Sequence, residues 1–313
     1  MSDKTSTIPA PATSTSIESS TTNPYKAARE ALDRDGFVIL SANLFPSFDL
    51  DALQTAAARL STAARTGQWP YIRTLPKQFP PWPQDPSNGI WGVQHLLHPS
   101  NPDHDLFAAS YFDAELLKYV AALIQCEEDQ LTMELYNMLV RPERDFELRW
   151  HRDDVSASAT PEEELERLKR PGHHAQWNLA LYEDSSLVLV PGSHKRARTE
   201  EERSADPYAK SLPGQITVRL QAGQVAFYNN NILHRGIYDS RKERMTLHGS
   251  IGTIKAGSER ARNVLQHGVG EWAKDDDFSG LDPSMQERAR EMRQRLTELG
   301  RENEDVGFFS KDE

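Results

Sequence analysis

The sequence predicts an all-β core with flanking helices, more specifically a double-stranded β-helix of the jelly-roll, cupin-like kind. Between residues 131 and 253, short apolar segments follow one another and are separated by Gly and Pro, as at Pro191-Gly192 and Pro213-Gly214. A single helical pattern interrupts this series, at 160–172. Many short strands without alternating helices are typical of a sandwich or barrel rather than of a parallel sheet. The other helical patterns lie before and after the series, where they would flank the barrel.

The composition of the chain changes near both ends. Residues 1–22 are mostly Ser, Thr, Pro and Ala, which bury too little apolar surface to offset the entropy of ordering, so we predict a disordered tail. We assign residues 23–275 to the double-stranded β-helix domain, with N-terminal helices and the helical insertion at 160–172. Residues 276–313 are predicted to form a charged C-terminal helix and a tail.

Capping residues define the first helices. Asn23 suits the N-cap of a helix that ends near Gly36, and the apolar run at 37–40 predicts a buried strand. Ser47 is the predicted N-cap of a second helix, which continues to about Arg65. A third helix is expected at 111–125, because its apolar residues recur with a helical period.

Residues 68–102 are rich in Pro and aromatic side chains and show no helical period, so we predict long ordered loops. Such loops either roof a ligand pocket or wrap the edge of a core. The largest rings in this segment are Trp69, Tyr71, Trp82 and Trp91.

The central region carries the strands of the predicted barrel. Apolar segments bounded by turn residues predict strands at 131–140, 147–151, 176–182, 186–190, 215–220, 224–229 and 245–253. Thr160 and Glu163 form a capping box that begins the inserted helix, and Pro171-Gly172 ends it. Asp282 begins the C-terminal helix, whose many charges indicate a solvated face.

Charge and cysteine usage exclude several kinds of partner. Lys and Arg number 36 against 47 Asp and Glu, a net charge of −11, which would repel a phosphate backbone, so no nucleic-acid partner is expected. The sequence shows no apolar run of about 18 residues and no signal-peptide pattern, so we expect no membrane association and a cytoplasmic protein. Because Cys126 is the single cysteine, any metal must be held by nitrogen and oxygen ligands.

The first candidate site is the pair His151 and Asp153, which follows a predicted strand. Residues i and i+2 of an extended chain point to the same side, so this imidazole and this carboxylate can meet at one point. The pair alone is not specific, because His and Asp two residues apart also occur in surface loops. A third ligand is needed to make the case for a metal.

His234 supplies that third ligand, at the far end of a segment that begins at Gly223 and contains the predicted strand 224–229. Two His and one carboxylate occupy one face of an octahedron and leave three positions open, which is typical of non-haem Fe(II) oxygenases. The open positions suit a bidentate 2-oxoacid and dioxygen. A closed structural zinc site would need four protein ligands.

A 2-oxoacid with a distal carboxylate would also need a cation, and a guanidinium offers two parallel N–H donors to two oxygens. Arg244 stands at the start of the last predicted strand, and Arg241 is the competing candidate. We prefer Arg244, because a strand holds a side chain more rigidly than the turn around Arg241 does.

With these residues in place, the chain resembles the phytanoyl-CoA dioxygenase family of Fe(II)/2-oxoglutarate enzymes over residues 30–255. The matching phrases are Asp-Gly-Phe-Val at 35–38, Trp-His-Arg-Asp at 150–153 and Val-Pro-Gly-Ser-His-Lys at 190–195. His234 and Arg244 fill the distal metal-ligand and 2-oxoglutarate positions of the family. The resemblance implies Fe(II), 2-oxoglutarate and O2 as cofactor and co-substrates, with release of succinate and CO2.

The resemblance also implies softer site assignments. Tyr136 and Met138, on one face of the first barrel strand, and Trp177, on the strand after the iron motif, would contact 2-oxoglutarate. An aromatic residue or Met on a strand is otherwise a core residue. No catalytic residue beyond the metal ligands is expected. Because Asp153 is present, hydroxylation is favoured over halogenation, for which related enzymes lack this carboxylate.

Departures from the family pattern bear on the substrate. Arg152 replaces a residue that is often Gln, and Ser185-Ser186 replaces the usual Asn-Gly, while the helix at 160–172 lengthens the lid. We expect Arg152, Trp91 and His248 to contact a small, apolar or aromatic metabolite, as in secondary metabolism. The alternatives are a cupin-like metal enzyme that does not use 2-oxoglutarate and a non-catalytic jelly-roll binding protein.

Overall fold

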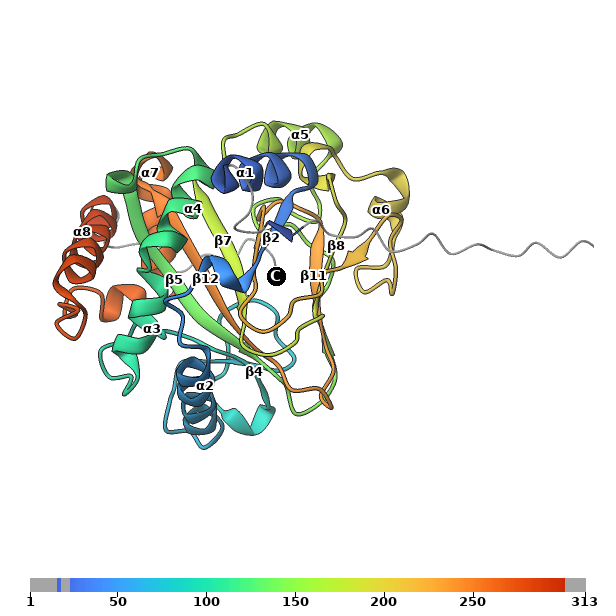
Figure 1. The fold of residues 1–313 in the computed structure, drawn as a ribbon. Coiled ribbons are helices and arrows are strands. Elements are labelled where there is room, and N and C mark those ends of the chain that lie inside the picture. The colour runs from blue at the N-terminus through green and yellow to red at the C-terminus, as the bar shows by residue number, and fades with distance from the viewer. Residues whose placement is uncertain (1–15, 18–22, 302–313) are drawn as a thin grey trace, which may run out of the picture.

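Two β-sheets form the centre of the computed structural model, which describes residues 16–17 and 23–301 (Figure 1). The larger sheet has the strand order β1-β2-β10-β7-β12-β5-β4-β3, and the smaller has the order β6-β11-β8-β9. The larger sheet consists of β1 (Ser16–Ile17), β2 (Phe37–Leu40), β3 (Ile72–Thr74), β4 (Ile90–Val93), β5 (Leu131–Val140), β7 (His174–Ala180), β10 (Val225–Tyr228) and β12 (Met245–Thr253). The smaller consists of β6 (Phe146–Glu147), β8 (Leu187–Leu189), β9 (Ile216–Thr217) and β11 (His234–Tyr238). Two such sheets with flanking helices confirm the predicted double-stranded β-helix.

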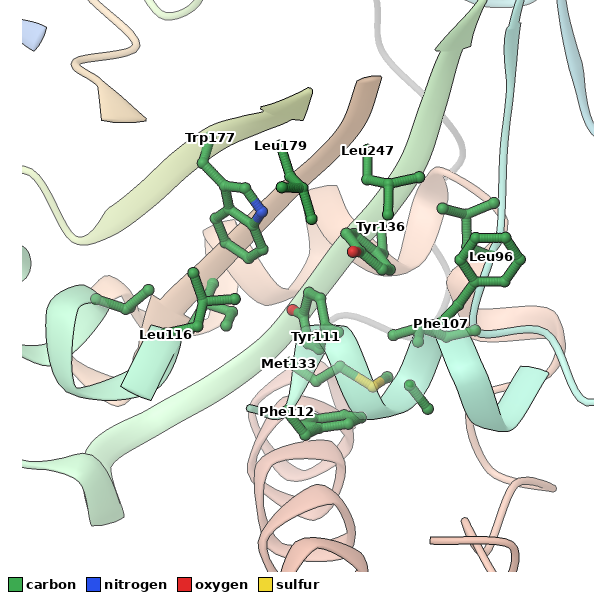
Figure 2. Close-up of a cluster of buried hydrophobic side chains, with 14 of the residues drawn as sticks. Leu96, Phe107, Tyr111, Phe112, Leu116, Met133, Tyr136, Trp177, Leu179 and Leu247 are labelled. Atoms are coloured by element: carbon green, nitrogen blue, oxygen red, sulfur yellow. The ribbon is translucent and has the colours of Figure 1, made fainter. Parts of the chain in front are cut away.

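Helices cover the side of the large sheet that faces away from the small sheet (Figure 1). They are α1 (Pro24–Asp35), α2 (Leu50–Arg65), α3 (His104–Tyr111), α4 (Ala114–Ile124), α7 (Gly257–Gln266) and α8 (Pro283–Gly300), whereas α5 (Pro161–Leu168) and α6 (Glu200–Ser204) lie on the side of the small sheet. Side chains of α3 and α4, such as Phe107, Tyr111 and Leu116, pack on residues of β5, β7 and β12 in one buried cluster (Figure 2). Burial of this apolar surface holds the helices to the sheet.

Strand register decides which side chains face the helices and which face the small sheet. Gly249 of β12 pairs with Tyr136 of β5 and with Trp177 of β7, and these positions point toward the helices. A Cβ at Gly249 would lie 2.2 Å from the Trp177 ring, so glycine is needed for this packing. The neighbouring position, His248, pairs with Asn178 and points to the other face. That inner face is where the candidate site lies.

Several predicted elements agree closely with the structure. The strands predicted at 131–140 and 245–253 have those bounds as β5 and β12, and the Thr160 capping box begins α5. Asn23 caps α1, Gly36 ends it in a left-handed conformation, and Asp282 caps α8. In each case a capping side chain or a long apolar pattern identifies the element.

Other elements differ from the prediction. Asp49, not Ser47, caps α2, and the Ser47 hydroxyl instead donates to Asp113. The segment 68–102 contains the short strands β3 and β4 in addition to loops. Helices α3, α6 and α7 were not predicted, and His234 begins β11 instead of ending the segment that contains β10. Strands of three or four residues and short helices give no periodic signal of their own.

The predicted N-terminal tail and the end of the predicted C-terminal tail lie outside the described residues, apart from Ser16–Ile17, which pair in parallel with β2 as β1. Within the described ranges, no helix combines the length and the apolar character required to cross a bilayer.

Candidate metal centre

A backbone bridge brings His151, Asp153 and His234 together. The His151 N–H donates to the His234 carbonyl, and the His234 N–H donates to the His151 carbonyl, both at 3.0 Å. The Asp153 N–H donates to the Asn230 carbonyl at 2.9 Å, which extends the pairing of the two segments. One ligand atom from each of the three side chains lies within 4.8 Å of the others. Residues 83 positions apart in the chain therefore form a single cluster.

Both imidazoles are oriented by hydrogen bonds on their Nδ1 atoms. His151 Nδ1 lies 2.8 Å from the Arg149 carbonyl, and His234 Nδ1 lies 2.8 Å from the Ile232 carbonyl. A carbonyl only accepts, so each Nδ1 carries the proton and each Nε2 keeps its lone pair free. The two Nε2 atoms lie 3.5 and 3.7 Å from Asp153 Oδ1. This is the arrangement in which three ligand atoms converge on one ion.

The protonation states suit metal binding. Burial, together with the neighbouring His234, holds the pKa of His151 well below its usual value, so the ring is neutral at physiological pH. Burial raises the pKa of the Asp153 carboxyl, and the side chain of Gln176 donates to its Oδ2 at 3.1 Å. A bound divalent cation would stabilise the ionised form of this carboxylate. In the described part of the chain, no fourth His, Cys, Asp or Glu joins the cluster, which leaves coordination positions open.

The triad lines a cavity of about 440 Å³ between the two sheets, a size typical of small-molecule sites. Two predicted substrate contacts, Trp91 and His248, also line this cavity. Of the predicted aromatic roof, Trp82 and Trp91 lie at the cavity, whereas Trp69 and Tyr71 pack in the helix-side core. The cavity has an apolar wall made of Phe79, Leu135, Leu139, Leu148 and Val155.

Arg244, directly before β12, is buried in the same cavity and held rigidly. Its Nε donates to Asp184 at 2.8 Å, its Nη2 donates to Thr246 at 3.3 Å, and the Tyr238 ring lies 4.3 Å from its guanidinium carbon. Its Nη1 has no hydrogen-bond partner among the described residues. Arg241, by contrast, is exposed and pairs with Asp239. Arg244 therefore provides the cavity with a fixed guanidinium that has a donor to spare.

Tyr136, Met138 and Trp177, the expected 2-oxoglutarate contacts, lie on the opposite face of the sheet from the triad. Figure 2 shows Tyr136 and Trp177 pointing into the buried cluster beside Tyr111. The Tyr136 hydroxyl lies 2.8 Å from the Ser110 hydroxyl in that core. The three residues share a face of the sheet, as the two-residue period requires, but it is the face that the helices cover. We therefore assign none of the three to 2-oxoglutarate binding.

Arg152 also lies away from the cavity, contrary to the expected contact with substrate. Its guanidinium is buried and donates to the carbonyls of Ser193 at 3.0 Å, Arg196 at 3.1 Å and Asn231. Because His151 and Asp153 point to one side of the extended segment, the residue between them points to the other. Arg152 fixes the Pro-Gly-Ser-His turn against the segment before β11.

We predict that Arg152→Ala lowers the free energy of unfolding by about 3 kcal/mol, because three carbonyls lose their donor and the buried Glu164 loses the Arg152 charge. Arg241→Ala, which changes an exposed arginine, is the control and should stay within about 0.5 kcal/mol of the unaltered protein. Urea unfolding measures both. Unaltered stability of the Arg152 variant would contradict this role.

The cavity also contains residues that the sequence did not indicate. Asn263 comes from α7, His267 is the residue directly after this helix, and Gln78 and Arg73 come from the segment predicted as loops. Gln176 and Asn178 come from β7, on the face opposite Trp177. Gln176 and Asn178 had an available signal, since both lie next to Trp177 on the strand predicted at 176–182.

Three comparisons relate the sequence and fold of this chain to known proteins. The family model for phytanoyl-CoA dioxygenase matches residues 32–244. The solved structure of EctD from S. alaskensis in its apoform aligns with a TM-score of 0.52 at 20% identity, covering 79% of this chain and 85% of that one. EctD with 2-oxoglutarate and 5-hydroxyectoine aligns with a TM-score of 0.51 at 21% identity, covering 78% and 83%. EvdMO1 aligns with a TM-score of 0.50 at 18% identity, covering 73% and 50%. No curated protein matches the sequence.

Proposed function

The chain belongs to the phytanoyl-CoA dioxygenase family, and from this we propose that it is an Fe(II)/2-oxoglutarate-dependent dioxygenase. In this proposal His151, Asp153 and His234 hold the iron, and Arg244 binds the distal carboxylate of 2-oxoglutarate. The reaction converts 2-oxoglutarate, O2 and a small metabolite into succinate, CO2 and an oxidised product, with hydroxylation as the favoured outcome. The observation that carries the proposal is the convergence of three ligand atoms within 4.8 Å, with both imidazoles fixed through Nδ1.

The donor set fits Fe(II). Two imidazole nitrogens and one carboxylate oxygen are the ligands of non-haem Fe(II) oxygenases, and the open positions accept a bidentate 2-oxoacid and dioxygen. When bound, the iron supplies the activation of dioxygen, and 2-oxoglutarate supplies two electrons through its decarboxylation. The protein supplies position and electrostatics: Gln176 holds Asp153, and Asp184 holds Arg244.

Arg244 is the residue that separates this proposal from a cupin-like enzyme without 2-oxoglutarate. A cationic guanidinium cannot be a ligand of a metal cation. With an unpaired Nη1 in this cavity it can instead donate hydrogen bonds to a carboxylate. The apolar wall of the cavity, with Trp82 and Trp91, supports a substrate that has an apolar or aromatic body.

The test is succinate release from 2-oxoglutarate in the presence of Fe(II) and air, measured by chromatography. We expect succinate even without the natural substrate, because 2-oxoglutarate enzymes slowly decarboxylate their co-substrate alone. A matched reaction with iron omitted should give none. Iron binding without any succinate, and without measurable affinity for 2-oxoglutarate, would favour the cupin-like alternative, and absence of both would favour a binding protein.

A further inference from the structure

A second arginine, Arg73, reaches the metal cavity from the edge of the large sheet. It lies on β3 opposite Gly92 of β4, and its side chain crosses β4 toward the cavity, which it lines. A Cβ at position 92 would lie 2.8 Å from Arg73 Cδ and 3.2 Å from its Cβ and Cγ. Glycine at this position therefore leaves the space that the arginine side chain occupies.

The guanidinium of Arg73 has aromatic neighbours but no carboxylate partner within residues 16–17 and 23–301. Its central carbon lies 5.1 Å from the Trp82 ring centroid and 5.3 Å from that of Trp91. Its Nε is buried and has no hydrogen-bond partner in the part of the chain that the structure describes. The buried Arg244 is paired with Asp184, and the partly buried Arg260 is paired with Glu134. Arg73 therefore differs from these two arginines, because no carboxylate of the described residues pairs with it.

The charge of Arg73 acts on the metal site and its surroundings. Burial lowers its pKa to about 10, so it remains a cation at neutral pH. Burial and, next, the charge of Arg73 lower the pKa of His248 to about 3. Asp153 is the carboxylate among the groups that raise the pKa of Arg73, since burial raises the pKa values of Tyr228 and Tyr238 and keeps these two side chains neutral. In the proposed site Asp153 is a ligand of the iron, so it is not a dedicated ion-pair partner of Arg73.

A guanidinium that lines a ligand cavity without an ion-pair partner among the described residues indicates an anionic ligand, because a desolvated charge is costly unless it is paired. The proposed co-substrate does not fill this role, since one carboxylate of 2-oxoglutarate is proposed to bind at the iron and the other at Arg244. A third anionic group must come from another molecule. The remaining ligand of the cavity is the substrate.

Building on the proposed function, we propose that Arg73 binds a carboxylate of the substrate, so that the substrate class is a small organic acid with an apolar or aromatic body. The carboxylate lies against the guanidinium beside Trp82 and Trp91, and the body lies along Leu135, Leu139 and Leu148. The net charge of −11 weighs against anionic ligands at long range, but the local charge at Arg73 outweighs it inside the cavity.

The experiment is calorimetric titration of the protein loaded with Fe(II) and 2-oxoglutarate under argon, so that binding and not turnover is measured. The probes are benzoate, phenylacetate and hexanoate, each paired with its primary amide, which keeps the shape and removes the charge. We expect at least one acid to bind about 10- to 100-fold more tightly than its amide, the effect of one hydrogen bond to a charged group. Equal binding of acid and amide, or no acid binding with a Kd below about 10 mM, overturns the proposal.

Variants locate the effect at Arg73. Arg73→Gln should abolish the preference for the acid while leaving the affinity for 2-oxoglutarate unchanged, and Arg241→Gln, which removes an exposed charge, should keep the preference. Arg73→Lys keeps the charge and should retain part of the preference if Arg73→Gln does not fold. Gly92→Ala displaces the arginine without removing it and should weaken acid binding.

Two results at this position would overturn the proposal. If Arg73→Gln keeps the preference for the acid, another group binds the carboxylate. If Arg73→Gln weakens 2-oxoglutarate binding as Arg244→Gln does, Arg73 belongs to the co-substrate site. Failure of the unaltered protein to bind 2-oxoglutarate would instead contradict the proposed function, and the acid titration without 2-oxoglutarate would still report on Arg73.

Discussion

Replacing His234 with alanine is expected to lower the affinity for Fe(II) by more than about 100-fold, because loss of an outer hydrogen-bond partner alone costs about 10- to 100-fold. The structure gives the reason: its Nε2 is one of three converging ligand atoms, and its Nδ1 is fixed by the Ile232 carbonyl. Succinate formation should fall below detection as a result. Iron content after anaerobic loading and desalting, together with succinate analysis, measures both effects.

His248→Ala is the matched control for iron content. His248 carries the same imidazole group in the same cavity, but its Nδ1 lies 2.9 Å from the Asn178 side chain, and it does not belong to the triad. The His248 variant should retain about one iron per chain, as expected for a single three-ligand site. Equal iron content in the two variants would show that His234 is not a ligand.

The second large effect is expected at Arg244. Arg244→Gln should raise the Kd for 2-oxoglutarate by about 10- to 100-fold, because a hydrogen bond to a charged group contributes about 1.5–3 kcal/mol. The guanidinium is held by Asp184 and Thr246, so its free Nη1 is oriented before the ligand binds. Anaerobic titration of the iron-loaded protein with 2-oxoglutarate measures this Kd.

Arg241→Gln is the control for this prediction, since Arg241 is exposed and outside the cavity. Its Kd should equal that of the unaltered protein. Arg244→Lys keeps a charge for Asp184 and tests whether the planar fork is needed, because one ammonium cannot make the same pair of parallel hydrogen bonds. A normal Kd in Arg244→Gln would remove Arg244 from the proposed co-substrate site.

The cluster of His151, Asp153 and His234 could be predicted from the sequence because the chemistry and spacing of its members are largely local. His151 and Asp153 must share a side of an extended chain whatever the rest of the fold does. The prediction of His234 as a third member required only that its segment lie beside the segment of His151. The antiparallel bridge between His151 and His234 provides this. The segment with the predicted strand 224–229 ended at His234, whereas in the structure β11 begins at this residue. His234 nevertheless lies in the cluster with His151 and Asp153.

The face of a strand was harder to predict than the strand itself. The bounds of β5 and β12 agree with the prediction, yet Tyr136 and Met138 face the helices, while Leu135 and Leu139 face the cavity. Alternation tells which residues share a face, but both faces of this sheet are buried. Which face carries the ligand depends on where the helices pack, and that is a property of the tertiary structure.

Arg73 and the α7 residues could not be predicted for a related reason. β3 has three residues, too few for a periodic pattern, and the reach of Arg73 into the cavity depends on Gly92 of the neighbouring strand. Asn263 of α7 and His267 directly after it enter the cavity from a segment that follows the barrel in the chain. Both contributions come from contacts between segments, which local sequence does not encode.

The most direct test of the iron and 2-oxoglutarate site is an absorption spectrum recorded without oxygen. When Fe(II) and 2-oxoglutarate are added to the protein, we predict a weak visible charge-transfer band that neither compound gives alone, because the 2-oxoacid chelates a metal held by His151, Asp153 and His234. The band should be lost in His151→Ala. Absence of the band in the unaltered protein, or an unchanged band in the His151 variant, would contradict the account.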